Sequence, residues 1–210
     1  MYFDKDDSVY VVITPNDGLE DGQTLTSETV VIANSEPTDI TASVTSSDMF
    51  YNDSTLTCSA SASDIDPEDA TLTYTYSWST GYSGADLILA GAVMPGTDVT
   101  CTATATDDSG ASISVDATEM LVNRAPSVDS VSLPQNVTAE TASISCDAAA
   151  SDLDGETPTL TYVWTVGGVA HAETTNTLTD TFVYNDVIEC TVSSADAMEM
   201  GSSMSASTTV

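Results

Sequence analysis

The sequence predicts an all-β protein made of tandem antiparallel β-sandwiches. Three observations lead to this fold class. Short segments alternate between apolar side chains and Thr or Ser, which is typical of strands with one buried and one wet face. A cysteine, a tryptophan and a second cysteine recur in the same order in the two halves of the chain. No window shows the apolar period of an amphipathic helix.

The alternation predicts strands in equivalent places of the two halves. It occupies residues 56–62, 72–78, 99–105, 144–148, 160–164 and 188–192. Threonine suits the wet face of such strands because it is β-branched and polar. Each segment is therefore expected to turn one face toward a core and the other toward solvent.

Internal repetition predicts the domain organisation. Five landmarks recur in one order, 86 to 89 positions apart: Asn34 and Asn123, Cys58 and Cys146, Trp78 and Trp164, Cys101 and Cys190, Asp107 and Asp196. The repeat predicts one sandwich over residues 34–122 and a second over residues 123–210.

Residues 1–33 fit only the last third of this repeat. Val9, Val11 and Ile13 align with the strand that holds the second cysteine of each full repeat. The segment is therefore expected to be the last strands of a truncated sandwich, with Val11 in the place of that cysteine. Two strands alone are not stable, so preceding chain or strand exchange with another molecule would complete them. Preceding chain is favoured, whereas strand exchange predicts that a deletion of residues 1–33 folds but does not polymerise.

Two cysteines about 43 residues apart, with a tryptophan between them, resemble the inter-sheet disulfide and packing tryptophan of immunoglobulin-like domains. The stretch before each tryptophan is longer than usual and carries the acidic residues 64–69 and 152–156. Followed by Leu-Thr-Tyr-x-Trp, these stretches resemble the PKD-like and cadherin-like repeats of bacterial and archaeal surface and extracellular proteins. The resemblance implies that Trp78 and Trp164 lie in the cores, packed on disulfides.

The repeat frame pairs Cys58 with Cys101 and Cys146 with Cys190, since this connectivity stays within each repeat. Metal binding by cysteine would need close pairs such as Cys-x-x-Cys, which the sequence lacks. A catalytic cysteine would need a histidine, and the single histidine, His171, lies in a different strand region. Disulfides indicate an oxidising compartment, so we expect an extracellular or cell-surface location.

The charge balance excludes two classes of partner. The chain has 33 acidic residues against two basic ones, a formal net charge of −31. It repels phosphate backbones and anionic lipid, so nucleic acid is not an expected partner. No segment reaches the roughly 18 apolar residues of a membrane-spanning helix. The self-repulsion would be relieved by salt or by bound cations, so an acidic surface adapted to salt and specific cation binding both stay open.

Calcium is the specific hypothesis for the acidic residues, because hard cations take clustered oxygen ligands. In the immunoglobulin-like frame, the start of the first strand and two loops meet at one end. The first repeat would contribute Asn34, Asp64, Asp66, Glu68, Asp69, Asp107 and Asp108. The second would contribute Asn123, Asp152, Asp154, Glu156 and Asp196. The resemblance implies a cation at the junction of successive domains, and the alternative is that these are solvated turn residues.

Other motifs are weak. Asn52 and Asn136 match the N-glycosylation pattern. Nothing singles out a carboxylate pair for acid–base catalysis, and the sequence has no nucleophile elbow or phosphate-binding loop. Enzyme activity is therefore not expected, and calcium is the one cofactor under consideration.

The sequence favours a structural repeat segment of a long secreted or cell-surface protein, forming a semi-rigid stalk or extracellular filament. The alternatives are an adhesin or glycan-binding module and a non-catalytic accessory region of a secreted enzyme. Expected partners are neighbouring repeats of the same chain or identical subunits, together with a glycan or cell-surface ligand in the adhesin reading.

Overall fold

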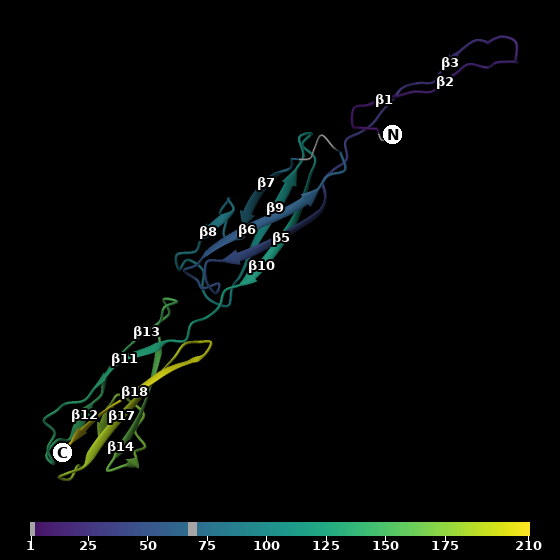
Figure 1. Ribbon diagram of the computed structural model, residues 1–210. Helices are drawn as coiled ribbons and strands as arrows, with labels where there is room; N and C mark the ends of the chain where they lie inside the picture. Colours follow the sequence, from purple (N-terminus) through teal and green to yellow (C-terminus); the bar gives the residue numbers. More distant parts are fainter. Residues whose placement is uncertain (1–2, 67–70) are drawn as a thin grey trace. The chain divides into compact units, whose positions relative to one another are not determined.

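The computed structural model describes residues 3–66 and 71–210, and Figure 1 shows them as strands joined by loops. No residue in these ranges is helical, which confirms the all-β class. The chain divides into two compact units. Unit 1 consists of Met1–Phe50, Ser54–Ile88 and Asp98–Met120. Unit 2 consists of Tyr51–Asp53, Leu89–Thr97 and Leu121–Val210, so two loops of the first repeat cluster with the second.

Unit 1 contains two three-stranded antiparallel sheets. The first has the order β5-β6-β8, with β5 (Thr38–Ser46), β6 (Thr55–Ser63) and β8 (Asp86–Ile88). The second has the order β10-β9-β7, with β7 (Thr73–Trp78), β9 (Asp98–Thr106) and β10 (Ser112–Met120). The Cys58–Cys101 disulfide joins β6 to β9 and therefore links the two sheets.

The core of this sandwich follows the predicted alternation. Along β9, every second side chain from Val99 to Ala105 is at most 1% exposed, while the residues between them are half-buried. Trp78 is 4% exposed and its indole N–H donates a hydrogen bond to the Gly84 carbonyl. The tryptophan therefore buries its ring while its polar group stays satisfied.

The remainder of unit 1 is a narrow hairpin near the N-terminus (Figure 1). Its strands are β1 (Ser8–Val9), β2 (Val12–Ile13), β3 (Leu25–Thr26) and β4 (Val30–Val31). β1 pairs with β4 and β2 pairs with β3, both antiparallel. Most of its large apolar side chains are exposed, in contrast to those of the sandwich.

Unit 2 repeats the sandwich with more strands. One sheet has the order β15-β14-β17-β18, with β14 (Thr159–Val166), β15 (Val169–Ala170), β17 (Val187–Ala195) and β18 (Met200–Thr209). The facing strands are β11 (Ser127–Ser132), β12 (Ser143–Ser145), β13 (Asp147–Ser151) and β16 (Thr177–Thr179). β11 pairs with β13, and β12 pairs with β16.

The Cys146–Cys190 disulfide links the two faces of unit 2, so both expected disulfides are present and all four cysteines are used. Cys146 lies between β12 and β13, where the strand of the first repeat is continuous. Trp164 is fully buried beside the disulfide cysteines, and its indole N–H donates to the Thr175 carbonyl. Both tryptophans are thus core residues, as the sequence predicts.

Candidate cation site

Three carboxylates converge at one end of unit 2. Asp152 and Glu156 belong to the loop between β13 and β14, and Asp196 follows β17. One oxygen from each of these side chains lies within 4.8 Å of the others. The predicted loops of the second repeat therefore do meet, and they meet through their acidic residues.

Hydrogen bonds within local turns orient these side chains. The Asp154 N–H donates to Asp152 Oδ1 at 2.7 Å, while the other oxygen of Asp152 has no hydrogen-bond partner among the described residues. Gly155 has φ +83°, a left-handed conformation that suits glycine at this turn. Asp196 Oδ1 accepts the N–H groups of Met198 and Glu199 at 2.6 and 2.7 Å, so its Oδ2 is also directed away from its own turn.

Asn123, at the start of the repeat, contacts the cluster. Asn123 donates its Nδ2–H to Asp196 Oδ2 at 2.9 Å and to Glu199 Oε1 at 3.0 Å. Its amide oxygen is thereby fixed in place. Because Asn123 lies in the segment that leads into β11, this contact joins that segment to the loop after β17.

Three oxygens of this cluster are buried without a hydrogen-bond partner among the described residues: Asn123 Oδ1, Asp152 Oδ2 and Glu156 Oε2. A buried acceptor left unpaired destabilises a fold by about 1–3 kcal/mol, so native structures usually satisfy it. A bound cation would satisfy such oxygens, and the carboxylates of Asp152 and Glu156 lie close enough together to share one. Every candidate ligand atom is a carboxylate or amide oxygen. Such a set of ligands fits a hard cation such as Ca²⁺ and does not fit a soft transition metal.

Electrostatics support the same interpretation. Burial raises the pKa of Glu156, and the negative charges of Asp196, Asp152 and Asp154 raise it further. By contrast, the hydrogen bond from Asn123 lowers the pKa of Asp196, and the N–H groups of Glu199 and Met198 lower it too. Burial and the neighbouring negative charges thus disfavour the ionised form of Glu156, and a bound cation would offset this repulsion.

Unit 1 has the corresponding arrangement at the start of the first repeat. Asn34 donates its Nδ2–H to Asp107 Oδ2 at 2.9 Å, and the Asp66 N–H donates to Asp64 Oδ1 at 2.9 Å. Asn34 Oδ1 and Asp64 Oδ2 are again buried without a partner in the part of the chain that the structure describes. Two of the predicted ligands, Glu68 and Asp69, lie outside the described residues.

The other predicted ligands have different surroundings. Asp66 and Asp154 are buried and bind the backbone of the incoming chain: Asp66 Oδ2 accepts the Ser35 N–H at 2.7 Å, and Asp154 Oδ2 accepts the Arg124 N–H at 2.6 Å. Asp108 forms an ion pair with Lys5 and is largely exposed. These three carboxylates hold protein groups, whereas the partnerless oxygens belong to other residues.

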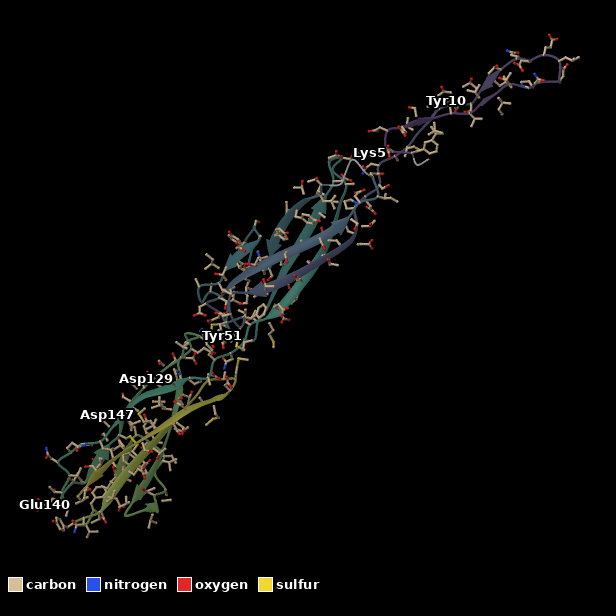
Figure 2. The ribbon with its side chains drawn as sticks, viewed as in Figure 1. Lys5, Tyr10, Tyr51, Asp129, Glu140 and Asp147 are labelled. Carbon is tan, nitrogen blue, oxygen red and sulfur yellow. A yellow bond between two sulfur atoms is a disulfide. The ribbon has the colours of Figure 1, made fainter. Side chains whose placement is uncertain are left out.

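Arg124 is a residue whose role the sequence analysis missed. Its guanidinium binds Asp154 Oδ1 at 2.8 Å, the Asn52 side-chain oxygen at 3.1 Å and the exposed carboxylate of Asp53. It also stacks 4.5 Å from the ring centre of Tyr51, which Figure 2 labels. All of these residues belong to unit 2. The available signal was a lone arginine, directly after the Asn123 landmark, in a chain with one other basic residue.

The two glycosylation candidates differ in accessibility. Asn52 is 1% exposed and its Nδ2–H donates to the Asp154 carbonyl at 2.7 Å, so this nitrogen is not available for a glycan in the folded protein. N-glycosylation at Asn52 stays a prediction. Asn136 is exposed.

The topology of the full repeats decides the fold. In each, a disulfide crosses from one sheet to the other, and the tryptophan pairs with the second cysteine on the neighbouring strand of the same sheet. Each full repeat is an immunoglobulin-like β-sandwich. In the described ranges, no helix has the length and apolar character needed to cross a membrane.

Comparisons with known proteins add the following. No family model matches the chain, and no curated protein matches it. A two-domain fibronectin type-III segment of chicken tenascin is 14% identical with a TM-score of 0.41, covering 84% of this chain and 100% of that chain. Extracellular cadherin domains 1–5 of protocadherin gamma B2 are 14% identical with a TM-score of 0.38, covering 97% and 45%. A Ca²⁺-stabilized adhesin of an Antarctic bacterium is 14% identical with a TM-score of 0.33, covering 96% and 55%. The chain thus spans about half the length of the last two.

Proposed function

We propose that the chain is a structural repeat segment of a secreted or cell-surface protein, forming part of a stalk or extracellular filament that bound Ca²⁺ stiffens. One observation carries the proposal. The hydrogen bond from a linker asparagine to a loop aspartate, with partnerless buried oxygens beside it, occurs at the start of both full repeats.

The two disulfides support an extracellular location, because such bonds persist in oxidising compartments. The formal charge of −31 supports a requirement for cations, since self-repulsion weakens a folded acidic protein. A non-catalytic role is part of this proposal, in keeping with a sequence that has one histidine and no nucleophile elbow.

In the second repeat, Asn123, Asp152, Glu156 and Asp196 would hold the ion. These residues come from the linker and from two loops, so one ion would connect three segments of the chain. The free energy of binding would then stabilise the folded linker by mass action. In the first repeat, Asn34, Asp64 and Asp107 would serve in the same way.

Calcium titration of the full chain tests the proposal. The melting temperature is measured with increasing Ca²⁺ at constant ionic strength, so that general screening of the acidic surface does not contribute. The wild type is expected to gain stability with Ca²⁺ and to lose it on chelation. Asp152→Asn combined with Glu156→Gln should remove the gain, whereas Glu140→Gln, which removes an exposed acid outside the cluster, should keep it. An unchanged melting temperature across millimolar Ca²⁺ would contradict the calcium site.

A glycan-binding role is the second candidate, and exposed aromatic side chains favour it. Tyr184 is 81% exposed and Tyr82 is 51% exposed. Aromatic faces on a sandwich surface can stack on sugar rings. Loss of binding to an immobilised glycan in Tyr184→Ala, with Tyr82→Ala as the comparison, would support this role over a purely structural one.

A further inference from the structure

We propose that the N-terminal hairpin, residues 3–33, is the last hairpin of a third repeat, and that its apolar face binds a partial sandwich of this same repeat type. That partner consists of strands equivalent to β5–β8. The inference does not depend on calcium or on the stalk function.

Strand pairing supports the equivalence. In the hairpin, Ser8 pairs with Val31 and Val9 pairs with Val30. In the first full repeat, Asp98 pairs with Met120 and Val99 pairs with Glu119. When Val9 is aligned on Val99, β4 is aligned on β10 as well. Each of these strands is followed by the linker asparagine of the next repeat, Asn34 or Asn123. The hairpin therefore has the register of β9 and β10 where the two strands leave the sandwich.

The turn of the hairpin supports it independently. Asp17 Oδ1 accepts the N–H groups of Leu19 and Glu20 at 3.0 and 3.1 Å. Asp196 Oδ1 accepts the N–H groups of the residues two and three positions after it in the same way. Because Asp17 and Asp196 occupy the same place in the repeat, the hairpin reproduces the loop of a full repeat as well as its strands.

The exposed face identifies what is missing. Val11 is 57% exposed and Ile13 is 62% exposed. Their counterparts in β9, Cys101 and Ala103, are fully buried against the opposing sheet. Tyr10, labelled in Figure 2, and Val12 are exposed on the alternate positions of the same strand. A face that is core in every full repeat is thus open to solvent in the hairpin, where its apolar side chains lose the stabilisation that burial gives them.

The chain order of the repeat selects the occupant. In both full repeats, the strands that cover this face precede the hairpin and connect to it through one loop. A second copy of the chain does not offer a vacant place, because β9–β10 and β17–β18 already close its two sandwiches. Strand exchange between copies would have to displace one of these hairpins. Each of them includes a strand, β9 or β17, that a disulfide holds to the opposite sheet.

A duplication experiment tests the proposal. Residues 34–90 are placed directly before residue 1 of the full chain, which supplies a copy of β5–β8 to the hairpin. Hydrogen exchange of residues 8–13 and 25–31 is then compared with that of the original chain. The proposal expects exchange to slow by at least about 100-fold, as for core strands. Unchanged rapid exchange in the duplicated protein, with the other two sandwiches still protected, would overturn it.

A cysteine variant keeps the test decisive if protection is partial. In the duplicated protein, Val11→Cys should form a disulfide with the copied Cys58 and leave no free thiol, because Val11 occupies the place of Cys101. Val12→Cys, one residue away on the opposite face, should leave both thiols free. Equal oxidation of the two variants would overturn the proposed register. The original chain is also studied over a series of concentrations. If it dimerises, and if residues 8–13 exchange more slowly as the dimer forms, the occupant is a second copy of the chain and the proposal is wrong.

Discussion

Arg124 encloses the carboxylate of Asp154, donating its backbone N–H to Oδ2 at 2.6 Å and its Nε–H to Oδ1 at 2.8 Å. The Asp154 side chain is 0% exposed. In the first repeat, the Ser35 N–H donates to Asp66 in the same manner, without a positive charge. The backbone contact is therefore a property of the repeat, whereas the buried ion pair belongs to the second repeat alone.

Arg124→Ala should destabilise unit 2 by about 3 kcal/mol, because it leaves a buried carboxylate without its counter-charge. The matched control is Asp53→Asn, which removes the other carboxylate bound by the same guanidinium. Asp53 is 54% exposed, so its loss should change the free energy of unfolding by less than about 1 kcal/mol. Urea unfolding of the full chain measures both values. Similar losses in the two variants would show that the buried pair has no special role.

Glu156→Gln should have opposite effects with and without calcium. The raised pKa of Glu156 means that the folded state binds its proton more tightly than the unfolded state does. Stability is therefore fully present below the ordinary pKa of a glutamate and is lost as the pH rises through the folded-state pKa. At neutral pH without Ca²⁺, the glutamine variant should be the more stable protein. With Ca²⁺, the wild type should be the more stable one.

Thermal unfolding in chelator and in millimolar Ca²⁺, at matched ionic strength, checks this crossover. Glu140→Gln again serves as the control, since it removes one exposed charge elsewhere. If Glu156→Gln stabilises the protein under both conditions, the glutamate repels its neighbours but does not bind the ion.

Asn123→Ala and Asn34→Ala should each make stability less sensitive to acid. The hydrogen bond from the asparagine is the largest cause of the lowered pKa of Asp196 and of Asp107. A lowered folded-state pKa contributes stability above the ordinary pKa of an aspartate, and this contribution is lost as the pH falls through the folded-state value. Without the asparagine, each aspartate should titrate closer to its ordinary range.

Carboxyl ¹³C chemical shifts followed between neutral and acidic pH would report each aspartate separately. Asp17, whose pKa is lowered by backbone N–H groups alone, is the internal control and should not move in either variant. A shift of the Asp17 titration would indicate a general change in charge in place of a lost hydrogen bond.

Local patterns account for what the sequence could predict. Alternation with a period of two reports the burial of β6, β7 and β9 directly, and the 86- to 89-residue repeat selects the disulfide pairs. The division of labour among the acidic residues was not predictable. Asp152 and Asp154 have the same side chain, two positions apart, yet one keeps a partnerless oxygen and the other binds Arg124. That difference depends on which carboxylate oxygen accepts a backbone hydrogen bond in each turn, which is a property of the folded backbone.

The two disulfides should contribute equally to stability. Their sequence separations are 43 and 44, so the chain-entropy model assigns each about 4 kcal/mol. Cys58→Ala with Cys101→Ala should therefore lower the unfolding free energy of its sandwich about as much as Cys146→Ala with Cys190→Ala. Replacing both partners avoids a free thiol and keeps the buried positions apolar. Urea unfolding under non-reducing conditions gives the two losses, and reduction of the wild type should reproduce their combined effect. A loss confined to one pair would mean that the other sandwich depends on its packing and not on the cross-link.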